Sequence, residues 1–174
     1  MTLRLGPADL DIAIRILQEG GVLAFPTDTV YGLGCLNPER LYEVKERPPE
    51  KRIAYLVAEP PDSFPEPARK LAAAFWPGAL TIVAGDHGYR MPDLALALAL
   101  LRETGPLPTT SANMSGEPAT SDPQAVWDQL NGRIDALLDG GPCPGGREST
   151  VVGVDGHVFR EGAIPIADIE RVLG

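Results

Sequence analysis

The chain has 174 residues, with 24 Asp and Glu against 15 Lys and Arg, and a formal net charge of −9 at pH 7. This acidic excess argues against general binding to nucleic acid or to anionic membranes, although a local basic cleft is compatible with it. No apolar run is long enough for a membrane-spanning helix. The N-terminal segment has acidic residues and no signal-peptide cleavage pattern, so we expect a cytoplasmic protein.

Helical and strand patterns alternate along the chain. Apolar residues at helical spacing, flanked by proline and glycine, predict helices at residues 7–19, 38–46, 67–76, 92–103, 121–130 and 166–173. Short apolar runs predict strands at residues 21–25, 53–58, 80–84, 107–111, 134–138, 149–154 and 157–160. Asp155-Gly156 predicts a hairpin between the last two strands. The alternation indicates a mixed α/β (α+β) fold with helices packed on a sheet, in a single domain of residues 1–174.

The two cysteines, Cys35 and Cys143, lie far apart in the sequence, and no CxxC or clustered His/Cys pattern accompanies them. We therefore expect two free thiols rather than a disulfide or a structural zinc site.

Four segments carry side chains that could bind a small anion. Residues 26–34 (PTDTVYGLG) follow a predicted buried strand, where ligands collect in open α/β sheets. Residues 45–52 (KERPPEKR) hold four of the 15 cations and contain two stiffening prolines. Residues 109–116 (TTSANMSG) offer five small polar side chains, and residues 140–150 (GGPCPGGREST) form a glycine-rich loop.

Each segment also has an ordinary structural interpretation. The first and third fit capped turns, and the second fits a solvated charged loop. The fourth has Gly141 and Gly146 at the spacing of a phosphate-binding loop, but Arg147-Glu148 replaces the required Lys-Ser/Thr, which excludes a P-loop NTPase. The residues alone therefore support an anion-binding α/β domain and nothing narrower.

The order of the motifs along the chain narrows the range of protein families that fit. The series PTDTVYGLG, KxRPxxK, FWPGxLT, SANxSG, ST and RxGAI resembles the YrdC-like family, which includes the threonylcarbamoyl-AMP synthases of tRNA modification. The resemblance runs from Leu10 to Ile164 and implies a twisted open sheet with a concave, basic ligand face.

The activity implied by the resemblance is that of a nucleotidyltransferase. ATP, L-threonine and bicarbonate would give L-threonylcarbamoyladenylate and pyrophosphate, with Mg²⁺ arriving through the nucleotide. A separate transferase complex would then pass the threonylcarbamoyl group to tRNA. No protein nucleophile is needed because a threonine carbamate oxygen attacks the α-phosphate, so we expect no catalytic nucleophile and no protein-bound metal.

The resemblance also assigns site residues. Those on the threonine side would be Thr29, Arg90, Ser111 and Ser149. Those on the ATP side would be Lys45, Arg47, Lys51, Asn113, Ser121 and Arg160.

The sequence departs from the family pattern at several places. Leu56 stands where the family usually has a histidine that contacts threonine, and Arg52 follows Lys51 where a proline is usual. The stretch from Ala84 to Arg90 is shorter than usual, and the chain ends soon after RxGAI, where longer synthases have another domain. Two alternatives therefore stay open: a non-catalytic module binding double-stranded RNA or tRNA, and a carbamoyl-handling adenylating enzyme with another substrate.

Overall fold

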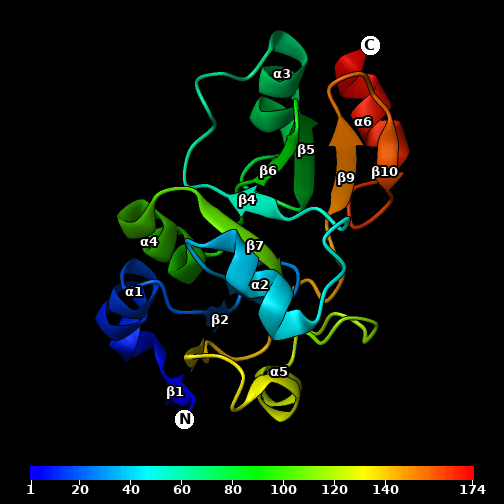
Figure 1. Ribbon diagram of the computed structural model, residues 1–174. Helices are drawn as coiled ribbons and strands as arrows, with labels where there is room; N and C mark the ends of the chain where they lie inside the picture. Colours follow the sequence, from blue (N-terminus) through cyan, green and yellow to red (C-terminus); the bar gives the residue numbers. More distant parts are fainter.

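Ten strands form one sheet in the computed structural model, which describes residues 1–174 (Figure 1). The strands are β1 (Leu3–Leu5), β2 (Leu23–Phe25), β3 (Gly32–Gly34), β4 (Ala54–Leu56), β5 (Leu80–Ala84), β6 (His87–Arg90), β7 (Leu107–Ser111), β8 (Ala136–Leu138), β9 (Thr150–Gly153) and β10 (Val158–Arg160). Their order across the sheet is β1-β8-β2-β3-β7-β4-β6-β5-β9-β10. Parallel and antiparallel neighbours are interspersed, so the sheet is mixed, as the alternation of elements predicts.

Six α-helices pack on this sheet. They are α1 (Leu10–Gln18), α2 (Pro38–Lys45), α3 (Glu66–Phe75), α4 (Ala95–Thr104), α5 (Pro123–Leu130) and α6 (Ile166–Leu173), with a 3₁₀ turn η1 (Pro7–Asp9) before α1. Helix α1 lies beside α4, and α3 lies beside α6 (Figure 1). None of the helices is long and apolar enough to cross a membrane.

The buried apolar side chains divide between the two faces of the sheet. In β2, Leu23 and Phe25 belong to a cluster under α1 and α4, whereas Ala24 belongs to a cluster under α2 and α5. This follows from the two-residue period of a strand, which sends neighbouring side chains to opposite faces. A third cluster, which includes Leu71 and Ile82, packs between α3, α6 and the sheet.

All six expected helices and seven expected strands are present, with ends shifted by a few residues. The hairpin at Asp155-Gly156 is confirmed by the antiparallel pairing of β9 with β10. Both cysteines are free and buried, as expected.

Three strands were not expected: β1, β3 and β6. The short stretch after Ala84 is a hairpin, in which Ala84 pairs with His87 across the two residues Gly85-Asp86. Gly85 has a φ of +66°, a value that glycine adopts readily in such tight turns.

Strand β3 was missed because glycine is rare in strands. Here Gly32 and Gly34 are required by close packing against the aromatic ring of Phe25. A methyl group at Gly34 would lie 2.7 Å from Leu107 Cδ2 and 3.0 Å from Phe25 Cε1. Strand β3 therefore fits between β2 and β7 only without side chains at these positions.

Gly34→Ala should lower the free energy of unfolding by about 1–3 kcal/mol, because the added methyl overpacks a buried contact. Urea denaturation followed by tryptophan fluorescence measures it. Gly6→Ala is the matched control, since the nearest atom to an added methyl there is Asp9 Oδ2 at 3.8 Å and the φ of −92° suits alanine. The free energy of unfolding of the control should be unchanged or raised by up to about 1 kcal/mol. Equal midpoints for the two variants would contradict the packing argument.

Candidate functional site

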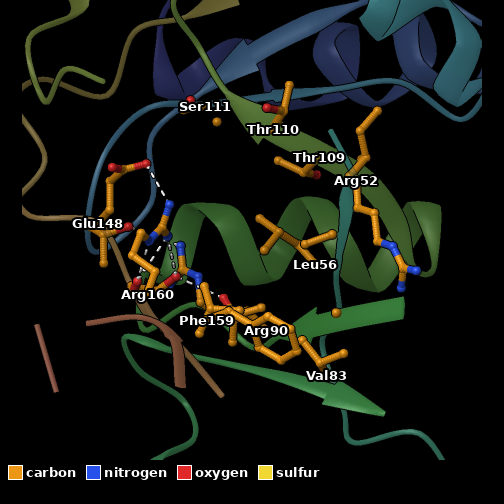
Figure 2. Close-up of a pocket in the computed structure, with 18 of the residues that line it drawn as sticks. Arg52, Leu56, Val83, Arg90, Thr109, Thr110, Ser111, Glu148, Phe159 and Arg160 are labelled. Carbon is orange, nitrogen blue, oxygen red and sulfur yellow. Dashed lines mark hydrogen bonds and ion pairs between the residues drawn. The ribbon is translucent and has the colours of Figure 1, made fainter. Parts of the chain in front are cut away.

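A cavity of about 740 Å³ opens on one face of the sheet (Figure 2). Alternate residues of the central strands face it, as the two-residue strand period requires. From β4, β5 and β6 they are the pairs Ala54 and Leu56, Thr81 and Val83, Gly88 and Arg90. From β7 three consecutive residues line the cavity, Thr109, Thr110 and Ser111, so the alternation does not hold at the end of that strand. The hollow exists because several of these residues are small.

Six of the ten site residues assigned from the sequence line this cavity. They are Thr29, Arg47, Arg90, Ser111, Ser149 and Arg160. The other four do not belong to its lining: Lys45, Lys51, Asn113 and Ser121.

Arg90 reaches from β6 to the loop after β2 and holds it in place. Its Nη1 donates to Asp28 Oδ1 at 2.6 Å, and its Nη2 donates to the hydroxyls of Thr27 and Thr29, each at 3.1 Å. Both charged side chains of the ion pair are buried, with 7% of Arg90 and 12% of Asp28 exposed. The hydroxyl of Thr29 is therefore fixed in position at the cavity wall.

Asp28 is the partner that the sequence analysis did not single out, although it lies inside the PTDTVYGLG motif. Its carboxylate occupies one edge of the Arg90 guanidinium. The Arg90 Nε–H makes no hydrogen bond within the chain and stays available to a ligand.

Lys45, the last residue of α2, lies behind the cavity rather than in it. Its side chain is 1% exposed. Its ammonium donates to the Ser111 carbonyl at 2.7 Å and the Thr110 hydroxyl at 3.2 Å. Lys45 thus fixes the end of β7, where Ser111 faces the cavity.

The chain turns sharply after Lys45. Glu46 has a φ of +51° and ends α2 in the left-handed conformation, which directs the next residue away from the helix. Arg47 then lies at the cavity and donates to the carbonyls of Lys51 and Arg52 at 3.2 and 2.9 Å. These bonds close residues 47–52 into a tight loop at the cavity edge.

On the other side of the cavity, Arg160 is fixed by the two residues that precede β9. Its guanidinium donates to the Ser149 carbonyl from both Nε and Nη2, at 3.1 and 2.9 Å, and pairs with Glu148 at 3.0 Å. The Ser149 hydroxyl shares a 2.8 Å hydrogen bond with the hydroxyl of Thr81. Figure 2 shows Glu148 and Arg160 on the side of the cavity opposite Arg52.

Asn113 is buried, and its side chain stabilises the loop of residues 113–117. Its side-chain amide donates to the carbonyls of Met114 and Glu117 at 3.1 and 2.7 Å. Its Oδ1 is the one buried side-chain polar atom with no hydrogen-bond partner.

The arginines of the cavity fall into two kinds. The lining contains four arginines and three acids, namely Arg47, Arg52, Arg90, Arg160, Glu50, Asp86 and Glu148. Arg90 and Arg160 each form an ion pair with a carboxylate, whereas Arg47 and Arg52 contact only backbone carbonyls. Arg47 and Arg52 form no ion pair, so an anionic ligand could bind them without displacing a carboxylate partner. No group of three or more His, Cys, Asp or Glu side chains gathers into a metal site.

Asp28→Asn should lower the free energy of unfolding by about 3 kcal/mol, because it leaves the Arg90 charge buried without a carboxylate. Chemical denaturation of the two proteins at neutral pH measures the change. The matched control is Asp168→Asn, which removes an exposed ion pair with Arg171. The control should change stability by less than about 0.5 kcal/mol, and a similarly small loss in Asp28→Asn would argue that the buried pair is unimportant.

Lys45 should make stability depend on pH. Burial lowers the pKa of its ammonium from 10.5 to about 8, and the charges of Arg47 and Lys51 act in the same direction. Between these pH values the unfolded chain binds more protons at this residue than the folded chain does, so the free energy of unfolding rises with pH.

We expect this residue to contribute a rise of about 1 kcal/mol from about pH 7.5 to about pH 9. Denaturation curves of the wild type and Lys45→Met across this range measure it, since the other titrating groups are shared and cancel in the difference. Stability profiles that stay parallel would show that Lys45 does not titrate there.

The sequence model of the Sua5, YciO and YrdC proteins, described as "Telomere recombination", matches residues 15–162. The threonylcarbamoyl-AMP synthase of Bacillus subtilis is 38% identical over 192 aligned positions, which cover 93% of this chain and 56% of that protein. The threonylcarbamoyl-AMP synthase of Xanthomonas campestris is 36% identical over 162 positions, which cover 76% of this chain and 86% of that protein.

The solved structure of Pyrococcus abyssi Sua5 complexed with L-threonine matches with a TM-score of 0.89 at 30% sequence identity, covering 100% of this chain and 61% of the other. The chain therefore spans little more than half the length of the Bacillus relative, and its fold is that of Sua5. Sequence and structure together show that the chain belongs to the Sua5/YciO/YrdC family.

Proposed function

We propose that this chain is an L-threonylcarbamoyladenylate synthase, which converts ATP, L-threonine and bicarbonate into threonylcarbamoyl-AMP and pyrophosphate. The observation that carries the proposal is that one cavity holds the hydroxyls of Thr29, Ser111 and Ser149 together with the two arginines that lack carboxylate partners. Relatives named threonylcarbamoyl-AMP synthase and the threonine complex of Sua5 support it.

The chemistry asks the protein to position reactants and to neutralise charge. The threonine amine first condenses with bicarbonate to a carbamate, which forms a C–N bond and releases water. A carbamate oxygen then attacks the α-phosphorus of ATP, the new O–P bond forms, and the bond to the β-phosphate breaks with release of pyrophosphate. Charge grows on the leaving pyrophosphate, and arginines stabilise it there without any protein nucleophile. Arg47 and Arg52 are the arginines best suited to this, because neither forms an ion pair with a carboxylate.

The hydroxyl side of the cavity is assigned to threonine. Thr29, Ser111 and Ser149 would hydrogen-bond the amino acid or its carbamate, and the free Nε–H of Arg90 would bind a carboxylate oxygen. Arg90 has a second part in this assignment, since its bonds to Asp28 and Thr27 fix the loop that carries Thr29.

The ATP side combines residues in the cavity with residues behind it. Arg47 and Arg160 would contact the nucleotide directly, and Lys45 would act by holding the end of β7. Lys51, Asn113 and Ser121 lie outside the lining, so direct contacts from them require the nucleotide to extend past the cavity edge. Mg²⁺ would arrive bound to the ATP phosphates and neutralise part of their charge.

Leu56 forms an apolar part of the wall and is 4% exposed. It packs in the same cluster as Leu107 and Leu100, so it supports the core as well as the cavity. A leucine here packs against a substrate but offers it no hydrogen bond, so the polar contacts to threonine must come from the hydroxyls and Arg90.

The product would serve a further reaction. Threonylcarbamoyl-AMP is a mixed anhydride, which a separate transferase complex would use to modify an adenosine of tRNA. A cytoplasmic location suits both the ATP supply and this tRNA-directed step.

The test is pyrophosphate release with ATP, Mg²⁺, L-threonine and bicarbonate, and with each component left out in turn. We expect release only with the full set, together with threonylcarbamoyl-AMP detected by mass spectrometry. Release that is indifferent to threonine would favour another substrate. No release, with salt-sensitive binding to tRNA, would favour an RNA-binding module.

Arg47→Ala should weaken ATP binding about 10- to 150-fold, the range of about 1.5–3 kcal/mol for a lost charge-assisted hydrogen bond. Isothermal titration calorimetry with ATP measures it. Arg69→Ala on α3 is the control, because Arg69 makes no side-chain hydrogen bond and does not line the cavity. Unchanged ATP affinity in Arg47→Ala would show that residues 47–52 are a solvated loop.

A further inference from the structure

Strand β10 contains a bulge beside the cavity. Val158 pairs with Val152 of β9, but Arg160 pairs with Val151, so two residues of β10 stand opposite one residue of β9. In a regular strand the side chains of Phe159 and Arg160 would point to opposite faces. The bulge breaks this alternation, and both residues line the same cavity.

Phe159 is 60% exposed, although phenylalanine is mostly buried in folded proteins. A single exposed apolar side chain is ordinary. This one differs because it lies at the edge of the cavity, and Figure 2 shows its ring below the centre of the cavity, near Val83.

The ring of Phe159 has an aromatic neighbour outside the cavity lining. His157 packs against it edge-on, with ring centroids 4.7 Å apart and an interplanar angle of 87°. Gly153 also lies close to the ring, since a methyl group there would be 3.4 Å from Phe159 Cε2. The neighbouring Arg160 is fixed by its bonds to Ser149 and Glu148. An aromatic ring and a hydrogen-bonded guanidinium thus come from consecutive residues and line the same cavity.

We propose that Phe159, aimed by the β10 bulge, is the stacking surface for the purine base of the nucleotide. The inference rests on the proposed function and adds a base-binding residue to it. A flat aromatic ring with adjacent guanidinium binds a nucleobase by stacking and cation–π attraction.

The arrangement of charged side chains around the cavity supports an orientation of the nucleotide in which the base lies beside Phe159. Arg47 and Arg52, which suit phosphates, come from the loop of residues 47–52, and Arg52 lies across the cavity from Arg160 in Figure 2. Arg160 is already paired with Glu148, so the side of the cavity near Phe159 carries less free positive charge. The uncharged base therefore belongs beside Phe159, and the phosphates belong at the opposite edge.

Calorimetry with two ligands tests the inference. ATP carries both base and phosphates, and inorganic tripolyphosphate carries phosphates alone. Phe159→Ala should weaken ATP binding about 5- to 150-fold, the range of about 1–3 kcal/mol for one stacked base, and leave tripolyphosphate affinity within about twofold. Phe159→Tyr keeps the ring and should bind ATP nearly as the wild type does. Ile12→Ala, which removes another exposed apolar side chain, far from the cavity lining, is the control and should change neither affinity.

Three results would overturn the inference while leaving the proposed function standing. All three concern the Phe159→Ala variant. They are an unchanged affinity for ATP, an equal weakening of the affinities for ATP and tripolyphosphate, and a loss of tRNA binding while ATP binding stays intact. A wild type that binds no ATP and releases no pyrophosphate would instead overturn the proposed function, and the inference with it.

Discussion

Arg90 and Asp28 come from separate parts of the chain and meet at 2.6 Å at the edge of the cavity, with little exposure to water. A buried charge is tolerated only when a partner satisfies it, so the position of each side chain fixes the other. The consequence is that the loop after β2 is tied to β6, and the hydroxyls of Thr27 and Thr29 are held on the same guanidinium. The position of the Thr29 hydroxyl at the cavity wall depends on this contact.

The cavity also depends on what its walls lack. Gly32, Ala54 and Gly88 line it with little or no side chain, so the sheet is hollowed at its middle while both faces remain packed elsewhere. A methyl group at Gly88 would approach Thr81 Cγ2 to 3.1 Å and reduce that space. The same small residues that weaken strand propensity therefore make room for a ligand.

The sequence predicted the helices and the longer strands well, because their apolar periods and their proline and glycine boundaries are local signals. It failed where tertiary packing decides: β3 is a strand because Phe25 and Leu107 leave space only for glycine. The β5–β6 hairpin has a local signal in its turn, Gly85-Asp86, but its second strand, His87–Arg90, lacks the apolar run that marks the other strands.

For the site residues too, the sequence predicts what depends on local motifs and fails where tertiary contacts decide. The motifs located Thr29, Arg90, Ser111 and Ser149, which the fold does bring to one cavity. They could not reveal that Arg90 is paired with Asp28, or that Lys45 is buried behind β7, because a motif records residue types and not their partners. The place of Phe159 depends on one extra residue in β10 relative to β9, and strand register cannot be derived from either strand alone.

A chain with a net charge of −9 can still attract an anion, because binding depends on the charges that remain unpaired at the site. Arg90 and Arg160 form ion pairs with Asp28 and Glu148, and these ion pairs hold the walls of the cavity in place. Arg47 and Arg52 donate only to backbone carbonyls and form no ion pair. The two edges of the cavity therefore differ. Arginines without an ion pair lie at one edge, and an arginine paired with a carboxylate lies beside an aromatic ring at the other.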